Sequence, residues 1–245
     1  MTGAVEPVAG GRDRVRLPIR WGIPDAAIVW VAAAFVSVLA TAPFTTENSK
    51  GDAVVTAAGV VAGIVVQAVA IVGACYLIAR WKGRGSLYAD FGLIVRPRNA
   101  VWLLAGLTAA VVAGVVSQPL VHLQNDGHTV QEVTKQLQNS KGVTLFMFSV
   151  AVVVCAPVAE ELLFRGLLLR SLLRRFEPVV AITISAVVFG LVHVIGDPKS
   201  YPDFPALAAL GIFNAILAYR TGSLSRSIFV HAGFNLLTVI AVIAR

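Results

Sequence analysis

The sequence predicts an all-α, polytopic membrane protein: a bundle of about seven transmembrane helices with its N-terminus in the cytoplasm. Of the 245 residues, 57% are hydrophobic and only 13% are charged, and the mean hydropathy is +0.80. A soluble domain is closer to half apolar and a quarter charged. The 20 Lys and Arg residues outnumber the 13 Asp and Glu residues. The bases do not form a patch interleaved with aromatic residues, so we expect a lipid bilayer and no nucleic acid as partner.

Seven apolar segments are long enough to cross, or nearly cross, about 30 Å of hydrocarbon. They run over residues 24–43, 53–79, 100–121, 143–176, 178–196, 204–220 and 225–244. Residues 1–22 are rich in Gly, Pro and Arg, which predicts a basic, disordered cytoplasmic leader. Residues 23–84 are predicted to form an N-terminal pair of transmembrane helices.

The first apolar segment has a second interpretation as a signal peptide. Residues 27–43 end in Ala40-Thr41-Ala42, small residues of the kind that signal peptidase cleaves. The proline at position 43 disfavours a cut there, and the basic leader is long for a signal peptide. We therefore predict that this segment is a retained first span.

The orientation follows from the charges between the segments. With the N-terminus inside, 15 of the Lys and Arg residues fall on the inner side and 5 on the outer side. Positive residues favour the cytoplasmic side of a membrane. This asymmetry places the N-terminus in the cytoplasm and the C-terminus outside.

Ionisable side chains inside the apolar segments are few, and each costs about 3 kcal/mol to insert at the bilayer centre. Such residues are functional candidates by default. Two amides accompany them on the last two segments. The complete set is Glu160, Glu161, Arg165, His193, Asn214, His231 and Asn235.

The spacing of these residues brings them to matching heights on paired helices. If segments four and five form a hairpin at Glu177, Glu160 and His193 both lie about 25 Å from the turn and can face each other. Asn214 and His231 are likewise level on either side of a turn at Gly222.

Within this set, different residues are suited to different tasks. Glu161 and Arg165 have the i, i+4 spacing of a helical ion pair, which leaves Glu160 on another face and free for chemistry. A water between Glu160 and His193 could attack a carbonyl, while His231 and Asn235, on one helix face, donate to the developing oxyanion. A metal bound by Glu160, His193 and His231, with one position open to water, would serve equally well.

Three ordered motifs resemble those of a known family. Glu160-Glu161-x-x-x-Arg165, Phe189-x-x-x-His193 and His231-x-x-x-Asn235 are similar to the motifs of the CPBP intramembrane proteases. That family includes the CAAX prenyl endopeptidases and bacterial proteins linked to bacteriocin processing and self-immunity. The resemblance covers residues 85–245, which we predict to be the protease domain.

The resemblance implies an intramembrane endopeptidase acting on a peptide or a membrane protein in a bacterial plasma membrane. It implies that Glu160 activates water, that His193 assists, and that His231 and Asn235 stabilise the oxyanion, with Glu161, Arg165, Phe189 and Asn214 in support. Whether the enzyme is of the metallo- or glutamate type stays open, so the cofactor is either a divalent metal such as zinc or none. The alternative is a non-catalytic protein that binds a peptide or bacteriocin for immunity, or acts as a scaffold.

Overall fold

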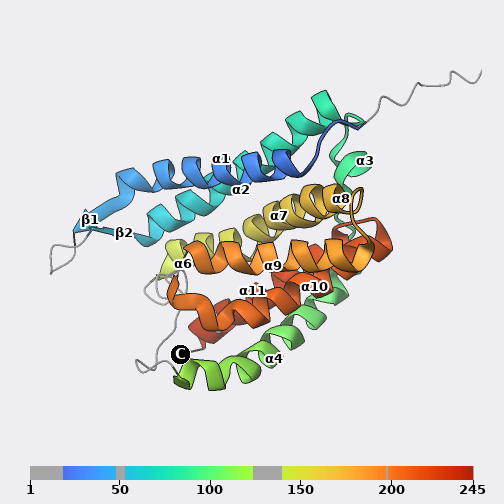
Figure 1. The fold of residues 1–245 in the computed structure, drawn as a ribbon. Helices are drawn as coiled ribbons and strands as arrows, with labels where there is room; N and C mark the ends of the chain where they lie inside the picture. The colour runs from blue at the N-terminus through green and yellow to red at the C-terminus, as the bar shows by residue number, and fades with distance from the viewer. Residues whose placement is uncertain (1–18, 48–52, 124–139, 197, 245) are drawn as a thin grey trace, which may run out of the picture.

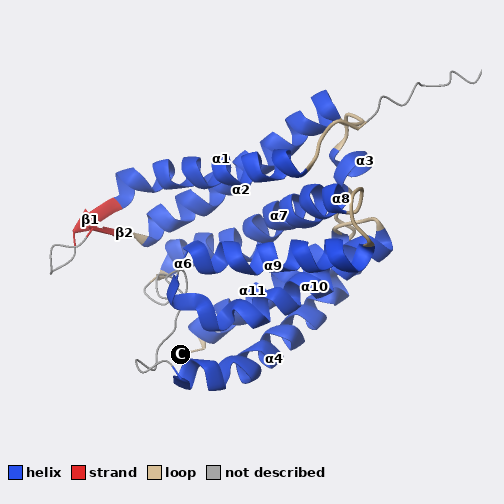
Figure 2. Ribbon diagram, viewed as in Figure 1, coloured by secondary structure: helices blue, strands red, loops and turns tan. Residues whose placement is uncertain are grey.

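The computed structural model describes residues 19–47, 53–123, 140–196 and 198–244. Within these ranges the chain is almost entirely helical, with one small two-stranded hairpin (Figures 1 and 2). The helices run roughly along one axis, so the predicted all-α bundle is confirmed. Six helices have the length and apolar composition of membrane spans.

The first two helices form a pair at one edge of the bundle (Figure 1). They are α1 (Ile23–Thr41) and α2 (Ala57–Lys82), and between them lie the antiparallel strands β1 (Thr45–Glu47) and β2 (Ala53–Val55). The predicted start of the second span at residue 53 is wrong because β2 pairs with β1. The helix begins after Thr56, whose side chain accepts a hydrogen bond from a first-turn amide.

The connector between α2 and the next span is partly buried. It contains the short helix α3 (Leu87–Phe91) and the 3₁₀ turn η2 (Pro97–Val101). The mixture of basic and apolar residues predicts a segment lying at the membrane surface. Phe91 is instead fully buried and packs on Trp21, with 5.1 Å between ring centroids.

The opposite edge of the bundle is formed by α4 (Trp102–Leu123), which packs closely on α11 (Ser225–Ile243). Gly106 and Gly233 make this approach possible, because a Cβ at either position would overlap a backbone carbonyl of the other helix. Small residues at helix interfaces commonly have this role in membranes. The predicted outer loop, residues 122–142, lies mostly outside the described residues.

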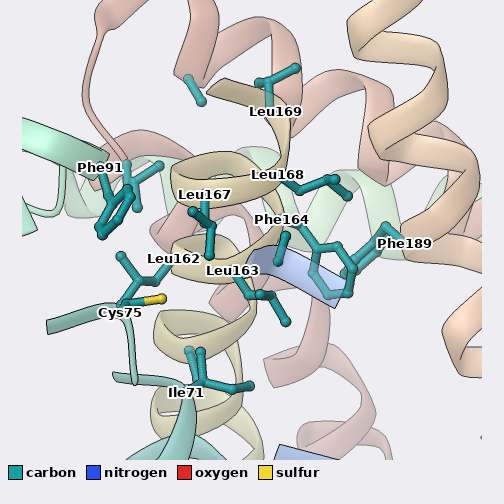
Figure 3. Packing of buried hydrophobic residues seen from close by; sticks show 14 of the residues in the cluster. Ile71, Cys75, Phe91, Leu162, Leu163, Phe164, Leu167, Leu168, Leu169 and Phe189 are labelled. Carbon is teal, nitrogen blue, oxygen red and sulfur yellow. The ribbon is translucent and has the colours of Figure 1, made fainter. Parts of the chain in front are cut away.

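The fourth span, Gly142–Leu172, is one continuous helical rod in which two π-helical stretches interrupt the α-helix. Its consecutive parts are α6 (Gly142–Val150), the π-helical stretch η3 (Ala151–Cys155), α7 (Ala156–Glu161), the π-helical stretch η4 (Leu162–Leu168) and α8 (Leu169–Leu172). All seven residues of η4 are buried, which makes this stretch the centre of the bundle. Figure 3 shows the side chains that surround it, including Ile71, Cys75, Phe91 and Phe189.

The last three helices complete the bundle. They are α9 (Pro178–Gly196), α10 (Phe204–Thr221) and α11, and α10 contacts both of the others. The six candidate spans end with α10. The predicted count of seven is therefore not confirmed, although α11 is a 19-residue helix where the seventh span was predicted.

One end of the bundle gathers the basic residues, and we call it the basic end. It carries Arg20, Arg80, Lys82, Arg84, Arg96, Arg98, Arg170, Arg174, Arg175, Arg220 and Arg226. Hydrogen bonds tie its segments together: the Arg20 amide donates to the Lys82 carbonyl, and Arg170 Nη2 donates to the Gly222 carbonyl over 2.7 Å. In Figure 1 this is the end near the labels α3 and α8. By the charge asymmetry we predict that it faces the cytoplasm.

Candidate functional site

A fully buried ion pair lies at the junction of α7 and η4. Arg165 Nη1 is 3.1 Å from Glu161 Oε1, and both side chains have no exposed surface. The Arg165 guanidinium also lies 4.2 Å from the centre of the Phe189 ring, and its Nη2 donates to the Gly211 carbonyl. The predicted i, i+4 pair is therefore present, and contacts from α9 and α10 hold it in place.

Two further groups donate to the same carboxylate oxygen. Asn214 Nδ2 on α10 and His231 Nδ1 on α11 each lie 3.0 Å from Glu161 Oε1. An ionised carboxylate only accepts hydrogen bonds, so we assign the proton to Nδ1 of His231. Glu161 thus links its own helical rod to α10 and α11. Because Nδ1 of His231 donates to Glu161, Nε2 of the same ring points away from Glu161.

The other nitrogen of His231 points to Glu160. His231 Nε2 lies 3.6 Å from Glu160 Oε2, and His193 Nε2 on α9 lies 3.7 Å from the same oxygen. Within the described residues this oxygen is shielded from solvent and has no direct hydrogen-bond partner. The Glu160 and His193 side chains are about one-quarter exposed, at 24% and 27%. One carboxylate oxygen and two imidazole nitrogens thus face each other across gaps that a water molecule can bridge.

His193 is held by its own helix and by an aromatic ring. Its Nδ1 lies 2.8 Å from the Phe189 carbonyl, one turn earlier on α9. A carbonyl only accepts, so Nδ1 carries a proton, and Nε2 of the ring faces Glu160. The Phe189 ring packs against both imidazoles, at 4.7 Å from His193 and 5.5 Å from His231.

Asn235 has a different neighbour from the one that the sequence predicts. Its Nδ2 donates over 2.9 Å to the carbonyl of Val152, in the π-helical stretch η3. In the i→i+5 pattern of a π-helix this carbonyl would bond the amide of residue 157, which is a proline and has no N–H. Asn235 therefore supplies the donor that Pro157 lacks, and it ties α11 to the rod carrying Glu160.

The structure thus brings seven of the eight predicted residues together: Glu160, Glu161, Arg165, Phe189, His193, Asn214 and His231. Asn235 lies one turn along α11 from His231, against η3. The sequence reasoning missed Gly211, whose carbonyl accepts from Arg165, and Ser185, whose hydroxyl donates to the Phe164 carbonyl in η4. A small or hydroxyl residue within an apolar helix is the signal that could have pointed to them.

Glu160, His193 and His231 are also the predicted ligands of a metal. Among the residues that the structure describes, no group of three His, Cys, Asp or Glu side chains has an arrangement that could hold a metal ion. The donor types are those that zinc prefers. The identity of the cofactor stays a prediction.

Comparison with known proteins gives one family match. Residues 142–237 match the type II CAAX prenyl endopeptidase Rce1-like family. This range starts at α6 and includes every residue of the site. No solved structure matches the chain.

Two bacterial relatives are similar to parts of the chain. An uncharacterized protein of Mycoplasma capricolum is 28% identical over 105 residues, which are 43% of this chain and 30% of that relative. The UPF0177 protein YbdI of Lactococcus lactis is 27% identical over 158 residues, 63% of this chain and 82% of that relative. The chain therefore spans less than a third of the first relative. The family match confirms the resemblance that the three motifs predicted: residues 142–237, within a multi-pass membrane bundle, are similar to the CAAX proteases.

Proposed function

We propose that this protein is an endopeptidase of a bacterial plasma membrane, and that it hydrolyses a peptide bond of a peptide or membrane-protein substrate at Glu160. One observation carries the proposal: the Nε2 atoms of His193 and His231 both face Oε2 of Glu160, at 3.7 and 3.6 Å. The match of this segment to a protease family supports the reaction class. The bacterial relatives support the location.

The charges of the cluster suggest which of its two histidines carries an additional proton. Glu160 and Glu161 carry two negative charges and Arg165 carries one positive charge. An unbalanced charge in a poorly solvated site is costly. A proton on His231 balances it, and this imidazolium donates to Glu161 from Nδ1 and presents an N–H at Nε2. His193 stays neutral and presents a lone pair.

Hydrolysis then follows from these positions. A water between Glu160 and His193 is oriented by the His193 lone pair and gives a proton to Glu160. Its oxygen bonds to the scissile carbonyl carbon, and the negative charge that develops on the carbonyl oxygen is held by the Nε2–H of His231. As the C–N bond breaks, Glu160 passes the proton to the leaving nitrogen. The products are a carboxylic acid and an amine, and transfer of the acid proton to the amine gives a carboxylate and an ammonium ion.

No step in this scheme passes through a metal. If a divalent ion is bound, Glu160, His193 and His231 are the residues that would hold it, and it would polarise the carbonyl and activate water. Cleavage by the purified protein before and after chelation, with zinc added back, tests this directly. Asn235 contributes to the scheme by fixing α11 against η3, and its predicted oxyanion contact remains a prediction.

Glu160→Gln tests the function because it keeps the size of the side chain and removes the proton acceptor. New protein N-termini are compared across the membrane proteomes of host cells that carry either the wild type or this variant, at matched membrane levels. Glu177→Gln is the matched control, because Glu177 is an exposed carboxylate at the turn before α9.

We expect a set of N-termini that is present with the wild type and the control and absent with Glu160→Gln. These N-termini would also identify candidate substrates. If the three proteomes are identical while a host phenotype such as bacteriocin immunity survives Glu160→Gln, the protein acts by binding and the hydrolytic scheme is wrong.

A further inference from the structure

A polar cavity lies at the basic end, separate from the glutamate–histidine cluster. It has a volume of about 620 Å³ and lies between η2, the end of α10 and the start of α11. Four arginines line it, together with the uncharged residues Asn99, Thr221 and Ser223: they are Arg96, Arg98, Arg220 and Arg226.

Within the described residues, no carboxylate pairs with the positive charges of this arginine pocket. No Asp or Glu is among its lining residues. Within the described part of the chain, none of the four arginines forms an ion pair with a carboxylate. Arg226 packs over the Trp102 ring, with 5.2 Å between its guanidinium carbon and the ring centre. Four guanidinium groups around one cavity favour an anion with several oxygen atoms, and phosphate matches this geometry.

The walls of the pocket are fixed by hydrogen bonds between segments far apart in the sequence. The Arg96 amide donates to Ser225 Oγ over 2.9 Å, and the Leu224 amide donates to the Gly92 carbonyl over 2.9 Å. The Thr221 hydroxyl donates across the turn before α11 to the Ser223 carbonyl. The arginines therefore extend from an ordered frame, which reduces the conformational entropy that a ligand must remove.

The surroundings of the pocket indicate the source of the phosphate. Next to it, the end of η2 and the first turn of α4 form an apolar surface, on which Val101 and Leu104 are 62% and 63% exposed. Trp102, beside Arg226, is the kind of residue that gathers at the membrane interface. A free phosphate would use only the arginines. A phospholipid would use both features, because its headgroup is anionic and its acyl chains are apolar.

We propose that the arginine pocket binds the phosphate headgroup of an anionic phospholipid whose acyl chains lie along the exposed apolar surface of α4. This site is independent of the proposed hydrolysis. It would fix the height of α4 and α11 in the bilayer through contacts with a single lipid.

The test measures lipid retention by the full-length protein. Wild-type protein is purified from nanodiscs that contain phosphatidylcholine with a rising fraction of phosphatidylglycerol, and retained lipids are counted by native mass spectrometry. The variant is Arg98→Gln with Arg220→Gln, since both side chains are exposed and neither supports the core. The matched control is Arg80→Gln with Arg175→Gln, which removes two exposed charges from the same end outside the pocket.

We expect retention of about one phosphatidylglycerol, with about 30-fold weaker affinity in the pocket variant, or about fivefold per arginine. The control should bind like the wild type. Arg98→Lys with Arg220→Lys, which keeps the charge, should restore most of the binding, and this result would also show that the first variant did not fail merely by misfolding.

Three results would overturn the proposal. Equal loss in the control would show a general surface charge effect. Protection of the protein against heating by inorganic phosphate alone, as strong as that by phosphatidylglycerol, would show a site for the free ion. Equal retention of phosphatidylcholine and phosphatidylglycerol would show that the pocket does not select an anion.

Discussion

Replacing Arg165 with methionine should destabilise the protein strongly, because it leaves a buried charge without its partner. Glu161 has no exposed surface, and Arg165 Nη1 lies 3.1 Å from its Oε1. The proposed proton on His231 balances only one of the two carboxylates, Glu160 and Glu161, so without Arg165 one negative charge stays unbalanced. Breaking a buried pair from one side costs about 3–5 kcal/mol. The variant also loses the contact of the guanidinium with Phe189 and its hydrogen bond to Gly211. We expect a loss near the upper end of this range.

Replacing both partners should cost much less than replacing one. In the double variant Glu161→Gln with Arg165→Met, no unpaired charge remains, and the carbonyl oxygen of the introduced glutamine side chain can still accept from Asn214 and His231. Exchange of a buried pair for neutral residues is often nearly neutral. We expect this variant to be at least about 2 kcal/mol more stable than Arg165→Met alone.

The assay is reversible unfolding in mixed micelles with increasing denaturing detergent, followed by circular dichroism. A double-mutant cycle on Glu161 and Arg165 gives their coupling free energy. The control is the same cycle on Asp25 and Lys82, whose atoms are 2.6 Å apart but whose lysine is 49% exposed, so its coupling should be at most about 1 kcal/mol. If the two cycles give equal couplings, or if the losses at Glu161 and Arg165 simply add, the argument from burial is wrong.

Two further predictions concern helix packing. Gly233→Ala places a Cβ against the α4 backbone and should lower the free energy of unfolding by about 1–3 kcal/mol in the same assay. The control Gly114→Ala, with no heavy atom within 4 Å of the new Cβ, should be neutral or slightly stabilising. Equal effects of the two substitutions would contradict the close crossing of α4 and α11. Asn235→Ala should cost about 1–3 kcal/mol because the Val152 carbonyl loses its donor. In a Pro157→Ala background the restored amide can take that place, so the cost should shrink, and an unchanged cost would refute the proposed link between Pro157 and Asn235.

Much of the site could be predicted because its geometry follows from helical rise along simple hairpins. Counting residues from the turn near Glu177 predicts that Glu160 and His193 lie at the same height. In the structure, His193 Nε2 lies 3.7 Å from Glu160 Oε2. Counting residues from Gly222 predicts that Asn214 and His231 lie at the same height, and in the structure both donate to Glu161. Such counting works where the helices are regular and the turn is short.

The rest depends on irregular backbone that counting does not foresee. The sequence predicts one partner for Glu161, Arg165, and places His231 opposite Glu160, whereas His231 lies near both carboxylates. The π-helical stretches on either side of α7 change which residues face which neighbour. Pro157 was the available signal, since a proline inside an apolar helix removes a donor. The hairpin of β1 and β2 was missed because Ala53–Val55 is as apolar as the helix that follows it.

The hydrogen bonds that converge on Glu161 have a consequence for the order of synthesis. Arg165 is made with Glu161 and can accompany it into the membrane as a pair, but Asn214 and His231 belong to helices that leave the ribosome later, α10 and α11. Until α11 is inserted, Nδ1 of His231 cannot donate to Glu161, and Nε2 of His231 cannot lie beside Glu160. A nascent chain that lacks α11 therefore carries Glu160 and His193 without the imidazole of His231. On the proposed mechanism, such a chain lacks the group that holds the oxyanion, so hydrolysis requires that α11 is inserted.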